Sequence, residues 1–322
     1  MNKPLPDKTI DVSAIIVNWN TKDLLLSCVR SLITNTHKVS LEIIVVDNDS
    51  KDGSQEVLKQ HFPDVTLIQN KENLGFAKAN NIGIRASSGK YICLVNSDVE
   101  LKNECLDKMK DYIDQHTEIG MLGPKIYYPD GKIQSSCKRF PTLWRHFCEA
   151  ICFHRIAPQS KLFAGEKMTF FTYDKILGVD CLIGAFWFIR RKALEQVGLL
   201  DENFFFYSED FDWCKRFWNH GWQVVFFPNA EIIHHTGSSS KKIPIKYYIQ
   251  QRRAKLQYWD KHHGWLSTKC IKVIMMLHQI VRILLQTLIY INPSSRETAL
   301  HKIKRSVACI LWLPVSKNPH NK

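Results

Sequence analysis

The 322-residue sequence lacks the patterns that mark several common protein classes. Its ten cysteines are scattered and include no CxxC pair, so we expect no zinc finger and interpret the thiols as reduced and buried. No GxGxxG follows the first predicted strand, which disfavours the usual dinucleotide-binding fold. A GxxxxGK followed by Ser or Thr is also missing, which disfavours a phosphate-binding-loop nucleotidase.

Long apolar segments and acidic residues are scarce as well. No stretch of about 18 uninterrupted apolar residues occurs, so we expect no clear transmembrane helix. Met1–Asp11 is polar and carries two prolines, so we expect no signal peptide. The 44 Lys and Arg outnumber the 31 Asp and Glu, which gives a formal net charge of +13. This excess favours nucleotide diphosphates, nucleic acid or an anionic lipid surface as partners, without choosing among them.

The N-terminal half contains alternating strand and helix patterns. Short apolar, β-branched runs predict strands that end in polar loops, and helical spacing predicts helices over 22–32 and 77–86. Because the carboxyl ends of parallel strands meet at one edge of an open sheet, these loops should converge on one ligand crevice. The four predicted strands are Val12–Val17, Leu41–Val46, Val65–Ile68 and Tyr91–Val95.

The second half is less regular. Helical spacing predicts helices over 105–115 and 209–219, and Pro129-Asp130-Gly131 predicts a hairpin turn. Residues 137–174 are aromatic-rich and poorly patterned, so we interpret them as a long excursion on the acceptor side. Regular structure resumes with predicted strands over 181–190 and 223–227.

A polar triplet, Asn96-Ser97-Asp98, follows the fourth predicted strand. Hard cations such as Mg²⁺ and Mn²⁺ prefer oxygen ligands and bridge phosphate oxygens. Asp98 offers a full negative charge and Asn96 only a neutral carbonyl. The triplet therefore suits a metal-diphosphate site, although such a triplet is also common in plain turns.

A cluster of carboxylates opens the predicted helix at Glu209. Glu209, Asp210 and Asp212 follow the aromatic run 204–207. A carboxylate that aromatic side chains partly desolvate has a raised pKa and can act as a general base. Acids at a helix start also interact favourably with the positive end of the helix dipole, so a structural role stays open.

Two adjacent histidines, His234 and His235, lie beyond the last predicted strand. Each is a candidate metal ligand or a structural residue. The segment that follows, Gly237 with Ser238–Ser240, suits phosphate binding through backbone amides and equally suits a simple loop.

With these residues in place, the sequence resembles glycosyltransferase family 2, and within it the rhamnosyltransferase-like members of bacterial surface-polysaccharide assembly. The resemblance runs from about Ser13 to Gly264. It depends on seven motifs in order: SAIIVNWN, IIVVDNDSKDGS, NKENLGFAKANNIGI, YICLVNSD, LIGAFWFIRR, FFFYSEDFDWCKRFWNHGW and HHTGSS.

The resemblance implies an α/β fold of the nucleotide-diphospho-sugar transferase (GT-A) type, with a mostly parallel central sheet flanked by helices. The catalytic domain would span residues 1–264, with a donor-binding half over about 11–98 and an acceptor and catalytic half over about 99–240. Residues 265–322 would form a helical C-terminal extension.

The resemblance also implies roles for individual residues. Asp210 matches the catalytic base, and Asp98 with His234 would hold the metal. The neighbouring His235 is the alternative metal ligand to His234. Asn96 departs from the family pattern, because many members have Asp there. Trp187, Glu209 and Trp213 are the candidate acceptor contacts, although core packing would explain the tryptophans equally well. The implied donor-binding residues are Asn18, Asp47, Asn73, Gly75, Asn80 and Ser97, with Asp47 reading the pyrimidine edge.

The implied activity is inverting sugar transfer that depends on Mg²⁺ or Mn²⁺. The donor would be a pyrimidine nucleotide sugar, dTDP- or UDP-linked, with dTDP-rhamnose as the first choice. The acceptor would be a saccharide or a lipid-linked saccharide, in O-antigen or capsule assembly. A catalytically dead nucleotide-sugar-binding scaffold is an alternative, which the presence of both Asp98 and Asp210 disfavours. A nucleic-acid-binding protein is a second alternative, disfavoured because much of the basic excess lies in the C-terminal tail.

The C-terminal tail predicts two amphipathic helices. From Ile271 to Ile291 the polar residues share one stripe, and from Arg296 to Leu313 basic residues lie beside apolar ones. Such helices suit an anionic membrane surface, which would place the protein in the cytoplasm, peripheral on the inner face of the bacterial cytoplasmic membrane. Packing of the same helices against the catalytic domain is the other reading, and both can hold. The polar stripe comprises Lys272, Gln279, Arg282 and Gln286.

Overall fold

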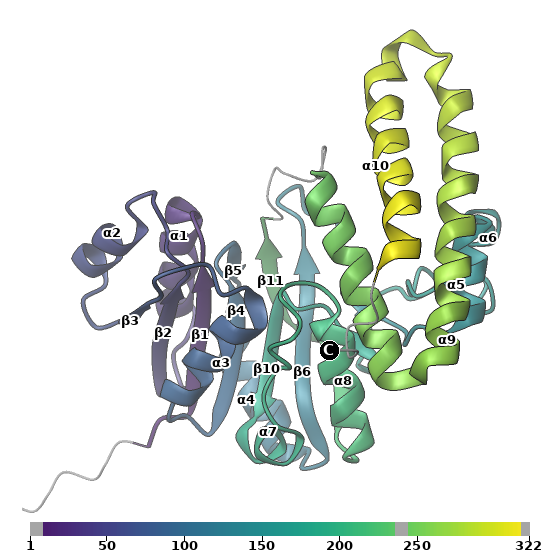
Figure 1. Ribbon diagram of the computed structural model, residues 1–322. Helices are drawn as coiled ribbons and strands as arrows, with labels where there is room; N and C mark the ends of the chain where they lie inside the picture. The colour runs from purple at the N-terminus through teal and green to yellow at the C-terminus, as the bar shows by residue number, and fades with distance from the viewer. Residues whose placement is uncertain (1–8, 236–243, 317–322) are drawn as a thin grey trace, which may run out of the picture. The chain divides into compact units, whose positions relative to one another are not determined.

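The computed structural model of the protein describes residues 9–235 and 244–316. The chain folds into two compact units, each assembled from separate segments (Figure 1). The first, the sheet unit, comprises Met1–Ser136, Tyr173–Phe205 and Trp213–Thr236. The second, the helical unit, comprises Cys137–Thr172, Phe206–Asp212 and Gly237–Lys322.

The sheet unit is built on one mixed β-sheet, nine-stranded within the described residues. Its strands are β1 (Val12–Asn18), β2 (Leu41–Asp47), β3 (Thr66–Gln69), β4 (Tyr91–Asn96), β5 (Val99–Leu101), β6 (Ile119–Tyr127), β8 (Leu177–Gly178), β10 (Phe186–Arg190) and β11 (Gln223–His234). The order is β3-β2-β1-β4-β10-β6-β11-β5, and β8 pairs with β11. Two further short strands are β7 (Cys137–Lys138) and β9 (Cys181–Leu182).

The parallel strands at the N-terminal end set the geometry of the polar loops. β1 pairs in parallel with β2 on one side and β4 on the other, and β2 pairs in parallel with β3. In this register Asn18 lies opposite Asp47, and Val17 lies opposite Asn96. The polar ends of three strands therefore meet at one edge, as the sequence predicts. β10 runs antiparallel to β4 and β6, so the α/β prediction is confirmed with a sheet that is mixed.

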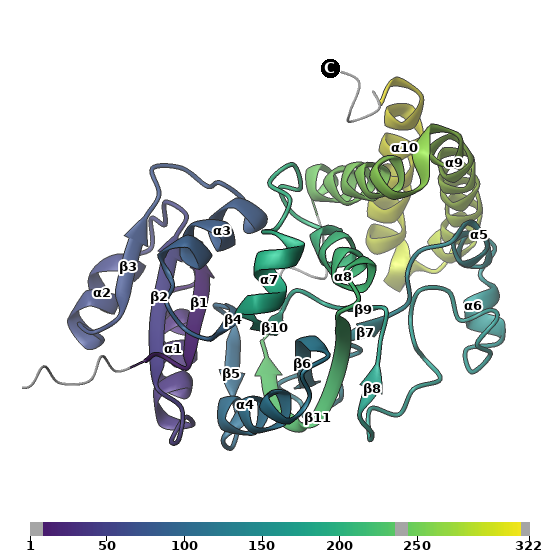
Figure 2. The ribbon, with the colours of Figure 1, turned by 90° about the horizontal axis from the view of Figure 1, so that it is seen from below.

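Helices cover both faces of this sheet. The helices are α1 (Lys22–Thr34), α2 (Ser54–His61), α3 (Phe76–Ala86), α4 (Cys105–Gln115), α7 (Arg191–Val197) and α8 (Glu209–Asn219). Figure 2 shows α3 and α7 on one face and α1 and α4 on the other. Strand alternation supplies a core to each face: Ala14 and Ile16 pack toward α1 and α4, whereas Ile15 faces Gly83 of α3.

The helical unit contains a long, broken helix and its neighbours. Its helices are α5 (Leu143–Ala150), α6 (Phe153–Ile156), α9 (Ile245–Tyr290), the short 3-10 helix η2 (Pro293–Ser295) and α10 (Arg296–Val315). Gly264, with φ of 74°, interrupts α9 and divides it into two helical segments. Beyond η2 the chain reverses, and α10 packs along α9, while α5 packs against α9 as well (Figure 1).

The expectation of no clear membrane helix is corrected by α9. This helix is long and apolar enough to cross a membrane, judged by length and composition alone. Lys272 and Arg282 interrupt its apolar run, which is why the sequence shows no continuous stretch of sufficient length.

Most predicted elements have the observed type, and the differences have local causes. The predicted strand 181–190 is divided into β9 and β10, and β11 continues beyond residue 227 to His234. Helices α2, α5, α6 and α7 were not predicted. The helical unit is larger than the predicted extension 265–322, because α5 packs against α9, and the predicted boundary coincides with the break at Gly264.

Asp107 of α4 ties the segment before β2 to the sheet unit, which predicts a stability effect. Its buried carboxylate accepts the backbone N–H groups of His37, Lys38 and Val39 at 2.9, 2.9 and 3.1 Å. Asp107→Ala removes the acceptor and should lower the free energy of unfolding by about 2–4 kcal/mol in urea denaturation. Asp111→Ala, at an exposed position of the same helix, is the matched control. An equal loss in both variants would show that Asp107 does not hold this segment.

Candidate active site

The loops after β1, β2 and β4 are joined by a network of side-chain hydrogen bonds. The Asn18 amide donates to Asp47 Oδ2 at 2.7 Å and to Ser50 Oγ at 3.0 Å. The Thr21 hydroxyl lies 2.7 Å from Asn18 Oδ1 and 2.8 Å from Ser97 Oγ. Asn18, Asp47 and Ser97, all candidate donor-binding residues, are therefore brought together at the carboxyl edge of the sheet.

Asp47 organises the loop that follows β2. Its side chain is only 1% exposed. Besides Asn18, it accepts the Ser50 backbone N–H at 2.9 Å and the Gln55 amide at 2.6 Å. Three donors on a buried carboxylate hold residues 48–54 in one conformation. A direct contact of Asp47 with the donor base stays a prediction.

Asn73 and Gly75 shape the turn into α3. Asn73 Oδ1 accepts the Gly75 backbone N–H at 2.9 Å and the Asn48 amide at 3.3 Å. Gly75 has φ of 82°, and a Cβ there would lie 2.5 Å from the Phe205 carbonyl oxygen, so only glycine fits. Asn80, another predicted donor contact, is buried, and its amide donates to the Phe76 carbonyl at 2.9 Å.

Asp98 and His234 form the candidate metal pair. β5 follows Asp98 directly and runs antiparallel to β11, so that His234 lies opposite Val99. His234 Nε2 is 3.2 Å from Asp98 Oδ1. On the other side of the ring, Nδ1 is 3.0 Å from Gln134 Oε1. Because the Gln134 oxygen is an acceptor, Nδ1 is the donor in this contact, and Nε2 is the ring nitrogen that faces Asp98.

His235 points elsewhere. Its Nε2 is 2.9 Å from Glu100 Oε1, and only its backbone N–H reaches Asp98, donating to the carbonyl oxygen at 2.8 Å. The two rings therefore face different carboxylates, and the geometry favours His234 as the ligand of the two. The predicted phosphate loop, Gly237 with Ser238–Ser240, lies outside the described residues.

The Asp98–His234 pair suits a divalent cation. Neighbouring ligand atoms of an octahedral ion with bonds of about 2.1 Å lie about 3 Å apart, close to the observed 3.2 Å. Gln134 orients the imidazole from behind, as a second partner commonly does for metal-binding histidines. No sequence motif marked Gln134, because it becomes a partner of His234 only through the fold.

The three carboxylates at the start of α8 have different surroundings within the helical unit. Asp212 is fully buried and pairs with Lys261 Nζ at 2.7 Å and His262 Nε2 at 2.8 Å. Asp210 Oδ2 lies 3.0 Å from Lys138 Nζ, and Oδ1 accepts the Phe211 N–H at 2.9 Å. Asp212 is therefore a structural ion-pair member, and Lys138, which no motif indicated, is the partner of the predicted base.

Glu209 is the third of these carboxylates. It is 6% exposed, and its Oε2 has no hydrogen-bond partner among the described residues. Burial, followed by the charge of the adjacent Asp210, raises the pKa of Glu209 to about 8. Near pH 7 Glu209 is therefore mainly neutral and can donate a hydrogen bond, whereas it is poorly suited to accept a proton.

The backbone before α8 is held in an unusual conformation. Tyr207 and Ser208 have φ of 75° and 65°, a region that side chains with a Cβ rarely adopt. Such conformations persist only where the surrounding structure enforces them, and they are common at functional sites. This strain supports a functional role for the start of α8.

Trp187 and Trp213 are core residues in the structure. Both are 0% exposed, and their rings meet edge to face at 5.3 Å. Their ring N–H groups donate to the carbonyls of Leu182 and Gly198 at 3.1 and 2.9 Å. The expected acceptor contact is corrected for both, because neither ring has a free face on which a sugar could stack.

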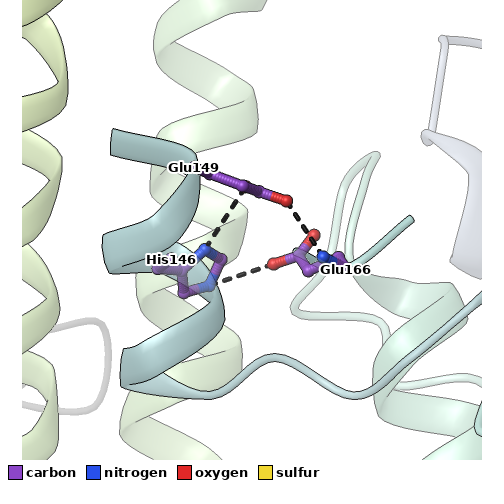
Figure 3. A group of neighbouring side chains, drawn as sticks. All are labelled: His146, Glu149 and Glu166. Atoms are coloured by element: carbon purple, nitrogen blue, oxygen red, sulfur yellow. Dashed lines mark hydrogen bonds and ion pairs between the residues drawn. The ribbon is translucent and has the colours of Figure 1, made fainter. Parts of the chain in front are cut away.

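A second group with metal-binding residue types lies in the helical unit. Figure 3 shows His146 between Glu149 and Glu166. The His146 Nε2 is 3.0 Å from Glu166 Oε1, and its Nδ1 is 3.7 Å from Glu149 Oε2. Lys255 Nζ lies 3.3 Å from the same Glu166 oxygen and supplies the positive charge that a metal would bring. We therefore interpret this group as an internal ion-pair network.

Comparison with known families decides the class of the protein. A family model described as Glycosyl transferase family 2 matches residues 13–198, more than half of the chain. This chain is a member of glycosyltransferase family 2. The resemblance stated from its motifs is thereby confirmed, and the matched span contains the donor loops and Asp98.

Two relatives of this family 2 glycosyltransferase are named as rhamnosyltransferases. The N-acetylglucosaminyl-diphospho-decaprenol L-rhamnosyltransferase of Mycobacterium tuberculosis is 28% identical over 239 residues, 70% of this chain and 76% of its own. The dTDP-rhamnosyl transferase RfbF of Shigella flexneri is 24% identical over 324 residues, 94% of each chain.

Solved structures confirm the glycosyltransferase fold. GalNAc-T7, solved with UDP, GalNAc and Mn²⁺, superposes with a TM-score of 0.55 at 17% identity. The match covers 79% of this glycosyltransferase and 50% of GalNAc-T7, so this chain spans about half of that protein. The mannosyltransferase PcManGT from Pyrobaculum calidifontis, solved with GDP-Man and Mn²⁺, superposes with a TM-score of 0.54 at 14% identity. The match covers 96% of this chain and 89% of PcManGT.

The raised pKa of Glu209 predicts that the stability of the glycosyltransferase depends on pH. Below about pH 4.5 the carboxyl is protonated in both states. Between its ordinary value of 4.5 and about 8, the unfolded chain releases the proton and the folded protein retains it. The free energy of unfolding should therefore fall as pH rises through this window, by at most about 1.4 kcal/mol per pH unit.

Glu209→Gln removes this effect while preserving shape. Its stability relative to wild type should increase from pH 5 to pH 8, by urea denaturation at both values. Glu195→Gln, at an exposed position of α7, is the control and should show no trend. If Glu209→Gln showed no trend either, the carboxyl would be ionised in the folded protein.

Proposed function

We propose that this family 2 glycosyltransferase is an inverting, metal-dependent enzyme. It transfers L-rhamnose from dTDP-rhamnose to a saccharide or lipid-linked saccharide in the assembly of a cell-surface polysaccharide. The observation that carries the proposal is the Asp98–His234 pair at the end of β4 and β11, beside the joined loops of Asn18 and Asp47. Rhamnose as the sugar rests on the two rhamnosyltransferase relatives.

The donor-binding role belongs to the loops of the sheet unit. The crevice of an open α/β sheet lies where the order of the strands reverses, here between β1, from which the chain continues outward to β2 and β3, and β4 on its other side. Asn18 and Ser97 flank this point and are linked through Thr21. Asp98 and His234 would hold Mg²⁺ or Mn²⁺, which would neutralise the charge of the departing nucleoside diphosphate.

The acceptor is activated by Asp210. As the acceptor hydroxyl oxygen bonds to the anomeric carbon, its proton passes to an Asp210 carboxylate oxygen, and the bond from that carbon to the diphosphate oxygen breaks. Attack opposite the leaving group inverts the configuration. Among the neighbouring carboxylates, Asp212 is committed to Lys261 and His262, and Glu209 holds its proton near pH 7.

The helical unit is the part that we propose to face the cytoplasmic side of the membrane. α9 and α10 carry exposed apolar residues at helical spacing together with exposed basic residues. This combination suits the interface of an anionic bilayer and would bring a lipid-linked acceptor within reach of the enzyme. The exposed apolar residues are Val273, Ile280, Leu284, Leu288, Val307, Leu311 and Val315.

The proposed donor and metal can be tested together. With Mn²⁺ present, dTDP-rhamnose should raise the melting temperature of the wild-type protein more than GDP-mannose or UDP-GalNAc, because bound ligand stabilises the folded state. His234→Ala should weaken Mn²⁺-dependent dTDP binding about tenfold or more in calorimetry, whereas His235→Ala should not. Equal losses in both variants, or none in either, would exclude His234 as the ligand.

The proposed role of Asp210 as the catalytic base predicts a loss of turnover in its amide variant. Asp210→Asn should lower transfer from dTDP-rhamnose to an N-acetylglucosaminyl-diphospho-lipid acceptor by about 10²–10⁴-fold, the usual value of general-base catalysis. Its affinity for dTDP with Mn²⁺ should stay within a few-fold of wild type. Asp111→Asn, exposed on α4, controls for the loss of one negative charge. More than about a tenth of wild-type turnover in Asp210→Asn would remove this residue from the role.

A further inference from the structure

Three arginines of the helical unit surround one tyrosine. The guanidinium carbons of Arg252, Arg305 and Arg282 lie 4.5, 4.6 and 5.6 Å from the ring centre of Tyr248. Arg252 Nη2 is 3.0 Å and Arg282 Nη1 is 3.4 Å from the Tyr248 hydroxyl oxygen, and this hydroxyl donates to Gln279 Oε1 at 2.8 Å. Arg252 lies in the first segment of α9, Arg282 in its second segment and Arg305 in α10.

This arginine cluster has no carboxylate in direct contact within the described residues, and Glu149 attracts Arg252 only from beyond ion-pair distance. Among the residues that the structure describes, none of the three arginines forms an ion pair with Asp or Glu. Arg305 is 8% exposed, and Gln279 is 0% exposed. Within the described part of the chain, neither Arg305 Nε nor Gln279 Nε2 has a hydrogen-bond partner. Buried donors are nearly always satisfied in folded proteins, so these donors indicate a missing acceptor.

Electrostatics favours an anion at this position. Because each guanidinium lies within 5.6 Å of one ring centre, any two lie within about 10 Å, one Debye length at 0.1 M salt. Partial burial strengthens their mutual repulsion, and the neutral tyrosine does not cancel it. Arg282 remains partly exposed, so an anion can reach the cluster from solvent.

We propose that Arg252, Arg282 and Arg305, with Gln279, form a binding site for a phosphate group. Guanidinium groups bind phosphate through paired N–H donors, and the unpartnered Arg305 Nε and Gln279 Nε2 are further donors for its oxygens. The site lies in the helical unit and is separate from Asp98 and His234, which belong to the sheet unit.

A membrane lipid is the source of phosphate that the surroundings favour. The two helices that carry Arg282 and Arg305 also carry exposed apolar residues, including Ile280, Leu284 and Val307. A helix with such neighbours lies at the level of lipid headgroups, where phosphates are concentrated. This choice of source rests on the proposed membrane association, whereas the phosphate site does not depend on it.

The first arm of the test uses free phosphate. Melting of the full chain is followed in phosphate-free buffer with EDTA, as inorganic phosphate or pyrophosphate is added at constant ionic strength. The wild-type melting temperature should rise by roughly 2 °C at a tenfold excess over Kd. Arg252→Gln and Arg305→Gln should lose this rise, whereas Arg253→Gln and Lys304→Gln, the exposed neighbours, should keep it. Arg282→Gln, at a partly exposed position, serves if Arg252→Gln or Arg305→Gln fails to fold.

The second arm distinguishes the sources. Sedimentation is compared with phosphatidylcholine vesicles that contain either phosphatidic acid, a phosphate monoester, or phosphatidylglycerol at matched surface charge. A lipid source predicts that the wild type prefers phosphatidic acid, and that Arg252→Gln and Arg305→Gln lose this preference while Lys304→Gln retains it. A response to free phosphate with no vesicle preference would support the site with a soluble ligand.

Three outcomes would overturn the proposal. The first is a wild type that responds to neither free phosphate nor phosphatidic acid. The second is a loss of the response in the exposed controls that is as complete as in the cluster variants. The third is a melting temperature that the cluster substitutions lower equally with and without phosphate, as expected if the arginines only stabilise the packing around Tyr248. Binding of dTDP with Mn²⁺, measured in parallel, should be unchanged in the cluster variants, so failure here is distinguishable from failure of the proposed transfer activity.

Discussion

The parallel, in-register pairing of β2, β1 and β4 is the constraint on which the donor site depends. It places Asn18 opposite Asp47 and brings the end of β4 beside them. A shift of one residue in either pairing would turn these side chains to the other face of the sheet. The buried Ile15 and Ile16 on opposite faces of β1 oppose such a shift, since each is matched to a different layer of helices.

A second pairing extends this edge. β11 joins the sheet beside β6 and β5, and its end carries His234 to Asp98. The register of β11 shifts between Phe227 and Glu231, where three additional residues lie on β11. The position of His234 therefore depends on an irregularity within the strand as well as on its pairing. Such bulges commonly re-aim side chains next to functional sites.

Three neighbouring acids at the start of α8 illustrate how environment divides roles among identical chemical groups. Asp212 has two cationic partners, Asp210 has Lys138, and Glu209 is buried with an unpartnered oxygen. Burial, together with the charge of the adjacent Asp210, raises the pKa of Glu209 to about 8. The helical unit shows a similar contrast among basic residues. Arg252 and Arg305 lie at Tyr248 with no ion pair to an acid within the described residues, whereas their neighbours Arg253 and Lys304 are exposed to solvent.

The sequence by itself determined the class of fold, the family and the residues at the strand ends, because apolar periodicity and polar strand termini are local properties. The identity of Asp98 and Asp210 as chemical candidates also follows from local motifs. Only the tertiary structure distinguished His234 from His235, placed Trp187 and Trp213 in the core, and brought Gln134, Lys138 and the arginine cluster to their partners. These features depend on contacts between residues that are distant in sequence, and on which face of an element each side chain occupies. Both are set by strand register and helix packing, which no local pattern encodes.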